Sequence, residues 1–368
     1  MVRIRWRRVH RWVGLLIAVP IAAQGVTGAI LAVAELIPAQ RTSSAPPRPV
    51  NEIVAAAEHQ VTAGSHATRY FAPDAAGYAA RVEVAVRGQT ALMIRIDPAT
   101  LAVIDASASG SSPLELVRSL HEKFLTVADG GRALTGWFGV GLLIMLATAV
   151  PIWWPRDGGI KQALLPDLSA RGVVFYRRLH GAAGGWTILV LALLTLTGIA
   201  MAFPVTARGV LGLPTRGASK TPPAGSIPSA VDLDRAVDLA RQAVPGAIPR
   251  MLVLPQADGA AVRVMMGSAG GGAVDAIQVQ VDAAAGKIVS IDAPATRPSG
   301  ETLYRWLHDL HTGDGIGGWW RVVAAAAGLS LPLLTFTGPM MWWRKRRGVR
   351  RKARGRHQAA DRAALTTD

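Results

Sequence analysis

One pattern occurs twice along this chain. His10 and His180 each stand before a long apolar run, and each is followed seventeen positions later by a Thr-Gly pair, at 27–28 and at 197–198. An internal repeat constrains the architecture strongly, because each copy builds the same structural unit. We therefore interpret the chain as two tandem copies of one unit.

The repeat extends beyond these segments. Residues 116–122 (LVRSLHE) match 303–309 (LYRWLHD), and residues 148–154 match 337–343, with a Pro and a Trp-Trp pair in both. Each half thus carries two histidines at equivalent places, one before each apolar segment. Ionisable side chains of membrane segments are functional candidates by default. The four histidines of the repeat are therefore candidate site residues: His10, His121, His180 and His308.

The apolar segments predict membrane helices. Half of the 368 residues are hydrophobic, and four stretches reach the roughly 20 apolar residues that a helix needs to cross about 30 Å of hydrocarbon. They are 13–37, 133–154, 184–205 and 319–343. The first run is longer than the 7 to 15 residues typical of a signal peptide, so we expect it to remain as a span.

Basic residues predict the orientation. The formal net charge is +16, and segments 1–11, 155–179 and 344–368 hold 20 of the 40 Lys and Arg but only four acids. Positive segments face the cytoplasm, so both termini are expected there, with two large loops outside. A basic balance can also indicate nucleic-acid binding. Here the arginines flank helix ends, which favours the lipid bilayer as partner and no nucleic acid.

The two large loops predict small folded domains. Each begins with a polar, proline-rich linker (39–50 and 213–228), continues with an amphipathic helix, and then alternates apolar and polar residues as strands do. Each loop is therefore expected to form a helix packed on its own small antiparallel sheet, near the lower size limit for independent stability. The sequence has no cysteine, which excludes disulfides, thiolate metal sites and covalently attached haem.

These patterns divide the chain as follows. We predict a cytoplasmic N-terminus and first span (1–38), a first outward domain (39–112), an interfacial helix and second span (113–156), a cytoplasmic loop (157–179), a third span (180–206), a second outward domain (207–298), an interfacial helix and fourth span (299–345), and a basic cytoplasmic tail (346–368).

Residues 94–105 and 279–292 resemble the strand-turn-strand close of a PepSY domain. The repeated order of helix, PepSY domain and helix, with Arg-Val-His-Arg-Trp at 8–12 and Trp-Trp before the basic exits, resembles the PepSY-associated transmembrane family over about residues 5–347. That family includes inner-membrane ferrisiderophore reductases. The expected fold is an α-helical membrane protein with four transmembrane helices in two tandem repeats and two small α+β PepSY-like periplasmic domains.

The resemblance implies b-type haem held by histidines of the transmembrane helices. Predicted depth pairs His10 with His180 and His121 with His308, which implies two haem b groups with these residues as axial ligands. The second half departs from the first by an additional histidine, His311, where the first half has Phe124. His311 could replace His308 on the iron, bond to a propionate, or face the substrate.

Arginines flank the predicted ligands. Arg11, Arg177 and Arg178 lie beside His10 and His180, and Arg118 and Arg305 lie before His121 and His308. They could pair with haem propionates. Membrane topology alone would also place arginines at these positions, so both interpretations stay open.

The expected function is transmembrane electron transfer by an oxidoreductase similar to ferric-siderophore reductases. A cytoplasmic or quinol donor would supply the electrons, and a periplasmic ferric siderophore would accept them. Two alternatives remain at this point: a haem-free PepSY protein that binds peptides, senses a signal or regulates a protease, and a transporter built from two repeated halves.

Overall fold

The computed structural model describes residues 2–365 except 38–41, 44, 63, 74–76, 127–129, 156–158, 168, 215–230, 257–259 and 269. Apart from residues 213 and 214, the second predicted linker therefore lies outside the described residues. The chain divides into a helical unit (1–33, 120–203 and 321–368) and a sheet unit (34–119 and 204–320).

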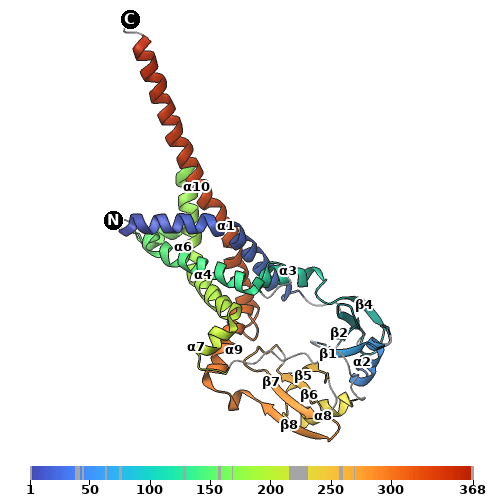
Figure 1. The fold of residues 1–368 in the computed structure, drawn as a ribbon. Helices are drawn as coiled ribbons and strands as arrows, with labels where there is room; N and C mark the ends of the chain where they lie inside the picture. The colour runs from blue at the N-terminus through green and yellow to red at the C-terminus, as the bar shows by residue number, and fades with distance from the viewer. Residues whose placement is uncertain are drawn as a thin grey trace. The chain divides into compact units, whose positions relative to one another are not determined.

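Four long helices dominate the helical unit: α1 (Val2–Ala34), α4 (Gly130–Trp153), α6 (Gly172–Ala202) and α10 (Gly318–Leu365) (Figure 1). Each contains a stretch long and apolar enough to cross a membrane. Their outer faces carry aliphatic side chains such as Leu16 and Leu189, both 81% exposed. Lipid solvates such surfaces and water does not, so the chain is a membrane protein with four candidate spans, as predicted.

These helices extend beyond the apolar runs that identified them. α1 begins at Val2, before the run that starts at Val13, and α6 begins at Gly172, before the run that starts at Gly184. Arginine and lysine are good helix formers, so the basic flanks continue the helices. Hydropathy therefore identifies the membrane-crossing parts, and the basic flanks extend α1 and α6 beyond them. A short helix, α5 (Ile160–Leu164), precedes α6.

Small residues let the long helices pack closely. Ile17 and Ile21 of α1 form a buried cluster with Leu191 of α6 and Leu331 of α10. Next to this cluster, a Cβ atom added at Gly328 would lie only 2.8 Å from the Gly25 carbonyl oxygen. Close backbone approach of this kind is typical of membrane helices, where packing replaces the hydrophobic effect between helices.

The sheet unit contains one antiparallel sheet in the order β4-β3-β2-β1-β5-β6-β7-β8 (Figure 1). The first loop supplies β1 (His66–Phe71), β2 (Ala80–Ala85), β3 (Leu92–Ile96) and β4 (Val103–Ala108). The second supplies β5 (Ile248–Val253), β6 (Val262–Gly267), β7 (Ile277–Asp282) and β8 (Lys287–Asp292).

The expectation of two separate sheets was therefore wrong. β1 pairs with β5, with Tyr70 opposite Leu252, and joins the strands of both loops into one sheet. β1 was not predicted from the sequence, because its polar residues His66 and Arg69 obscure its alternation. Pairing covers two strand edges that separate domains would leave open to aggregation.

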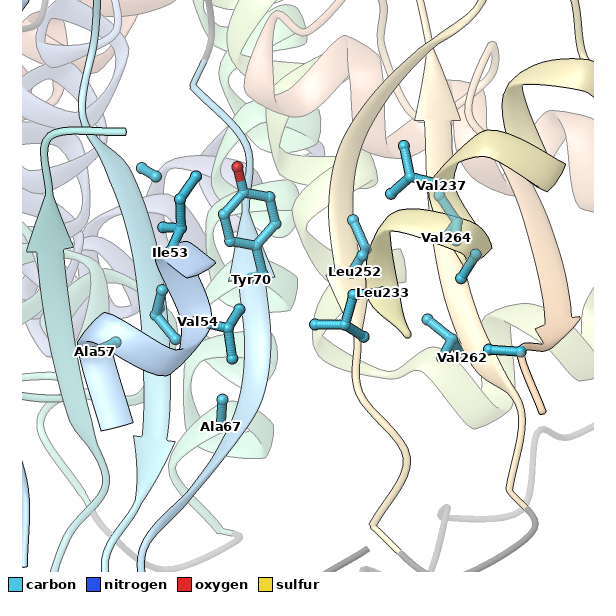
Figure 2. Packing of buried hydrophobic residues seen from close by; sticks show 14 of the residues in the cluster. Ile53, Val54, Ala57, Ala67, Tyr70, Leu233, Val237, Leu252, Val262 and Val264 are labelled. Atoms are coloured by element: carbon cyan, nitrogen blue, oxygen red, sulfur yellow. The ribbon is translucent and has the colours of Figure 1, made fainter. Parts of the chain in front are cut away.

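One face of the sheet is covered by two helices, α2 (Val50–Glu58) and α8 (Leu233–Ala243). α2, with Ile53 and Val54, packs over β1, β2 and β3, and α8, with Val237, packs over β5 to β8 (Figure 2). The inward residues of the central strands, such as Val82 and Val264, are fully buried. The alternation of apolar and polar residues along the strands thus corresponds to one buried face of the sheet, as predicted from the sequence pattern.

The remaining helices connect the sheet to the spans. α3 (Pro113–Lys123) and α9 (Ser299–Thr312) follow the last strand of each loop, so a helix forms at both predicted positions; their location at the membrane interface stays a prediction. α7 (Pro204–Val210) follows α6, and a short 3-10 helix, η1 (Pro294–Thr296), precedes α9.

The N-termini of α2 and α8 cap each other. The Asp234 carboxylate accepts hydrogen bonds from the backbone N–H groups of Val50, at 2.7 Å, and Asn51, at 3.1 Å. In return, the Asn51 side-chain oxygen accepts from the Leu233 N–H at 2.9 Å. Helix N-termini carry partial positive charge, so a shared carboxylate stabilises both ends. The backbone N–H of Arg235 and the Asn51 side chain lower the pKa of the neighbouring Asp232.

An Asp234→Ala substitution should loosen both helix ends, because it removes the acceptor of two α2 N–H groups. Loss of a capping side chain costs about 0.5–2 kcal/mol. We expect faster hydrogen exchange in the first turn of α2. Asp238→Ala is the matched control, because Asp238 is exposed on the same helix. Equal exchange in the two variants would contradict the reciprocal cap.

Candidate functional site

Two predicted histidines lie side by side in the helical unit. His10 of α1 and His180 of α6 have ring centroids 6.4 Å apart, and their ring planes are nearly perpendicular, at 83°. The two residues are 170 positions apart in sequence, and packing of α1 and α6 brings them together. The structure thus juxtaposes the pair that the predicted topology places at equal depth.

Each of these rings is held by a threonine from another long helix. His10 Nδ1 lies 3.0 Å from Thr148 Oγ1 of α4, and His180 Nδ1 lies 2.8 Å from Thr337 Oγ1 of α10. Both threonines are only 1% exposed. All four long helices therefore contribute one residue to a single cluster: His10, Thr148, His180 and Thr337.

The threonine hydroxyls determine which imidazole nitrogen carries the proton. Thr148 Oγ1 lies 2.8 Å from the Ile144 carbonyl oxygen, and Thr337 Oγ1 lies 2.8 Å from that of Leu333. A hydroxyl has one hydrogen, and donating it to the carbonyl leaves the oxygen to accept from a histidine N–H. Both bonds form only when Nδ1 is the donor, so each neutral ring keeps an unprotonated Nε2.

His121, on α3, likewise contacts a threonine hydroxyl, in this case one of α1. Its Nδ1 lies 3.0 Å from Thr27 Oγ1, and that hydroxyl lies 2.7 Å from the Ala23 carbonyl oxygen. The Gln24 side chain donates to the His121 carbonyl oxygen at 2.9 Å. A Cβ atom added at Gly28 would lie 2.9 Å from His121 Cε1, so the glycine makes room for the ring.

His308 and His311 lie on α9 in the sheet unit, whereas His121 belongs to the helical unit. His308 differs from the other three because its Nδ1 lies 3.3 Å from a carboxylate, Asp309 Oδ1. This hydrogen bond raises the pKa of His308. His308 therefore has a charged partner where His10, His121 and His180 have hydroxyl groups.

The Asp309 carboxylate makes several hydrogen bonds within the sheet unit. It accepts from the backbone N–H groups of Ala273, at 2.8 Å, and Val274, at 3.0 Å. Burial alone would raise the pKa of Asp309, but the bonds from His308 and these N–H groups hold it below its usual value. A carboxylate oxygen of Asp314 lies within 4.8 Å of the potential metal-binding atoms of His308 and Asp309. With its oxygens engaged, Asp309 holds the chain at 273–274 against α9.

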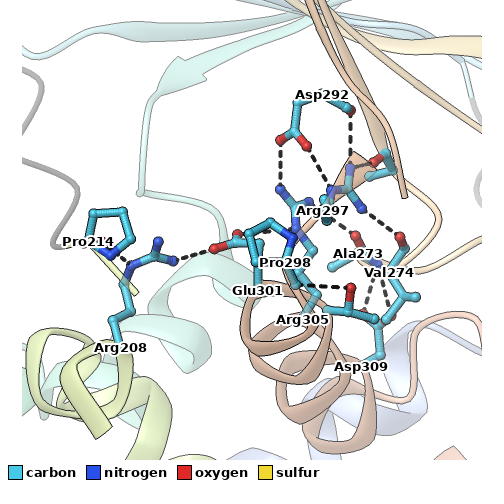
Figure 3. A network of polar contacts seen from close by, with 12 residues as sticks. Arg208, Pro214, Ala273, Val274, Asp292, Arg297, Pro298, Glu301, Arg305 and Asp309 are labelled. Carbon is cyan, nitrogen blue, oxygen red and sulfur yellow. Dashed lines mark hydrogen bonds and ion pairs between the residues drawn. The ribbon is translucent and has the colours of Figure 1, made fainter. Parts of the chain in front are cut away.

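A buried ionic network fixes α9 to the rest of the sheet unit (Figure 3). Glu301 of α9 pairs with Arg208 of α7 at 2.9 Å, and the side chains of both are about 10% exposed. Arg305 of α9 reaches Glu301 and also Asp292 at the end of β8, each at 3.3 Å. The helix that carries His308 and His311 is therefore held by charge pairs to two other elements.

Four of the five flanking arginines have protein partners. Arg11 lies over the ring of Trp12, 5.4 Å from its centroid, and Arg178 pairs with Asp167 at 2.8 Å. Arg118 is 3.9 Å from Glu35. The predicted contacts of Arg11 and Arg178 with haem propionates remain predictions.

The role of the threonines was not predicted from the sequence. The Thr-Gly pair at 27–28 and the stretches 148–154 and 337–343 served only to identify the repeat. The signal was present, because Thr148 and Thr337 are equivalent in the repeat. What the sequence could not show is that each hydroxyl points at a histidine of another helix.

Comparison with known proteins yields one family. The family model described as the PepSY-associated TM region matches residues 7–345, nearly the whole chain. No curated protein matches the sequence.

Proposed function

The chain belongs to the PepSY-associated transmembrane family, and from this premise we propose that it is a di-haem b electron-transfer protein of the bacterial inner membrane. It would take electrons from a cytoplasmic or quinol donor and reduce ferric iron bound to siderophores on the periplasmic side. The family membership supports the membrane architecture. The proposed cofactor rests on the geometry of His10 and His180.

The separation of these two rings supports axial ligation of one metal ion. Bonds from a transition metal to an imidazole nitrogen are about 2 Å long, and adding the ring radii puts the centroids of two opposed ligands roughly 6 Å apart. The centroids of His10 and His180 are 6.4 Å apart. This distance is the single observation that carries the proposal, and the residues present fit the group.

The threonine bonds support the same role. An imidazole ligates a metal through an unprotonated nitrogen, and a hydrogen bond at its other nitrogen orients the ring and raises its basicity. Thr148 and Thr337 would supply that bond to His10 and His180. These threonines thus hold the rings in the tautomer that ligation requires.

Haem iron, when bound, supplies a centre that gains and loses one electron. His10 and His180 would both hold the iron, which would suit electron transfer rather than binding of a substrate to the metal. We assign His10 and His180 to one haem. We assign His121 to the second, with His308 as the repeat-equivalent ligand and His311 beside it on α9.

Two haems match the distance that electrons must travel. One macrocycle cannot bridge roughly 30 Å of hydrocarbon, whereas the positive-inside rule would place one pair of ligands near each surface. Ferrous ion binds the hard oxygen ligands of siderophores less strongly than ferric ion does, so reduction would release the iron.

We expect the purified full-length chain to carry two non-covalent haem b groups, both low-spin, with a Soret band and sharp α and β bands on reduction. Acid-acetone should extract all of the colour, because the chain has no cysteine to form a thioether. A colourless preparation from haem-replete cells would overturn the proposal. It would favour a haem-free PepSY binding or sensor protein, in which His10 and His180 form an edge-to-face pair, as aromatic rings do.

A further inference from the structure

A cavity of about 400 Å³ opens in the helical unit where α4 ends and α6 begins, beside α5. Its lining includes Trp153, Pro155, Leu165, Arg177 and Arg178. The volume falls within the range of ligand pockets, about 300–1,000 Å³. We propose that this cavity binds the phosphodiester headgroup of an anionic phospholipid.

The polar part of the lining consists mainly of hydrogen-bond donors. Arg177 and Arg178 present guanidinium groups, which match phosphate oxygens in charge and in their paired donor geometry. Arg178 bonds to Asp167 at 2.8 Å, yet its side chain is 53% exposed, and a guanidinium has five N–H donors. None of the described lining residues is acidic, so the cavity favours an anion.

Trp153 adds an unusual donor. Its indole N–H is buried and has no hydrogen-bond partner among the described residues. The ring packs against α6, where a Cβ atom added at Gly185 would lie 2.7 Å from the Trp153 ring. Leaving a buried donor unpaired costs free energy, and such groups in native structures call for an explanation. Trp153 is among the residues that line the cavity, and a ligand oxygen there is the partner that we propose for this N–H.

The position along the helices favours a lipid over a free ion. The second candidate span ends at Trp153, and tryptophan is enriched where helices leave the hydrocarbon. Pro155, Ala163 and Leu165 place apolar surface beside the arginines, which suits the acyl end of a lipid. Basic pockets between transmembrane helices bind anionic headgroups in other membrane proteins.

The test is native mass spectrometry of the full-length chain in detergent, titrated with phosphatidylglycerol, with zwitterionic phosphatidylcholine and with inorganic phosphate. We expect preferential retention of phosphatidylglycerol. The double variant Arg177→Gln, Arg178→Gln should weaken it roughly tenfold to hundredfold, in line with loss of charged hydrogen bonds. Trp153→Phe, which keeps the ring and removes the N–H, should weaken it by about fivefold.

Arg171→Gln is the matched control, because Arg171 is an exposed arginine at the N-terminus of α6 outside the cavity. Its affinity for phosphatidylglycerol should equal that of the unchanged chain. Equal affinity in the double variant would overturn the proposal, as would inorganic phosphate binding as tightly as the lipid. Loss of haem absorbance from the double variant without loss of lipid would assign the arginines to propionates instead. The lipid result does not depend on whether haem is present.

Discussion

If the proposed function is right, His180→Ala should leave the protein with one haem per chain instead of two, because it removes one of the two histidines proposed to hold one of them. The remaining haem, assigned to His121, should keep its low-spin spectrum. We would measure the haem-to-protein ratio and the reduced visible spectrum. His66→Ala is the control: His66 lies on β1 and bonds to Gln256, outside the helical unit. Retention of both haems in His180→Ala would remove this residue from the site.

A finer substitution tests the tautomer argument within the same experiment. Thr337→Val keeps the shape of the side chain but removes the acceptor for His180 Nδ1–H. Loss of a hydrogen bond behind a metal-ligating histidine lowers metal affinity about 10–100-fold, so haem should dissociate faster from the variant. Thr337→Ser keeps the hydroxyl and should retain the haem. Equal dissociation rates in Val and Ser variants would show that the hydroxyl is irrelevant.

Glu301→Ala should destabilise the α9 region by about 3–5 kcal/mol, because removing one partner of a buried ion pair leaves the other charge uncompensated. Arg208 and Arg305 both lose their Glu301 contact in this variant. Hydrogen exchange reports local opening free energies, and the amides of α9 should exchange much faster than in the unchanged chain.

The control for Glu301 is an exposed pair in the same unit. The side chains of Arg48 and Glu52 are 53% and 41% exposed, and exposed pairs contribute about 0–1 kcal/mol. Glu52→Ala should therefore leave exchange of the α9 amides unchanged. If Glu301→Ala also had no effect, the network of Figure 3 would not be what holds α9 in place.

The membrane helices and the helix-plus-sheet character of the loops could be predicted because both are patterns of local hydrophobicity. The pairing of β1 with β5 could not be predicted, because it depends on two strand edges that meet only in the folded chain. Neither Tyr70 nor Leu252 carries a signal that identifies its partner strand. Each loop alone reads as a complete small domain, and only pairing reveals the shared sheet.

The candidate site could likewise be predicted only in part. The repeat and the predicted orientation were sufficient to pair His10 with His180, because equivalent positions lie at equal depth. The threonine partners depend on the rotation of each helix about its axis, which the sequence pattern does not give. The difference between His308, bonded to Asp309, and the hydroxyl-bonded histidines likewise emerges only from the structure.

The contacts between the two loops, which are the pairing of β1 with β5 and the capping of α2 by Asp234, affect how the chain folds during synthesis. Val50, at the start of α2, is capped by a carboxylate 184 residues further along the chain. The partner strand of β1, β5, is synthesised after a similar interval. At ribosomal rates of about 5–20 residues per second, that interval is on the order of 10–40 s. The first four strands of the sheet therefore have an unpaired edge at β1 while the next two spans, α4 and α6, are synthesised. Chaperones that bind exposed strand edges should matter most in this interval.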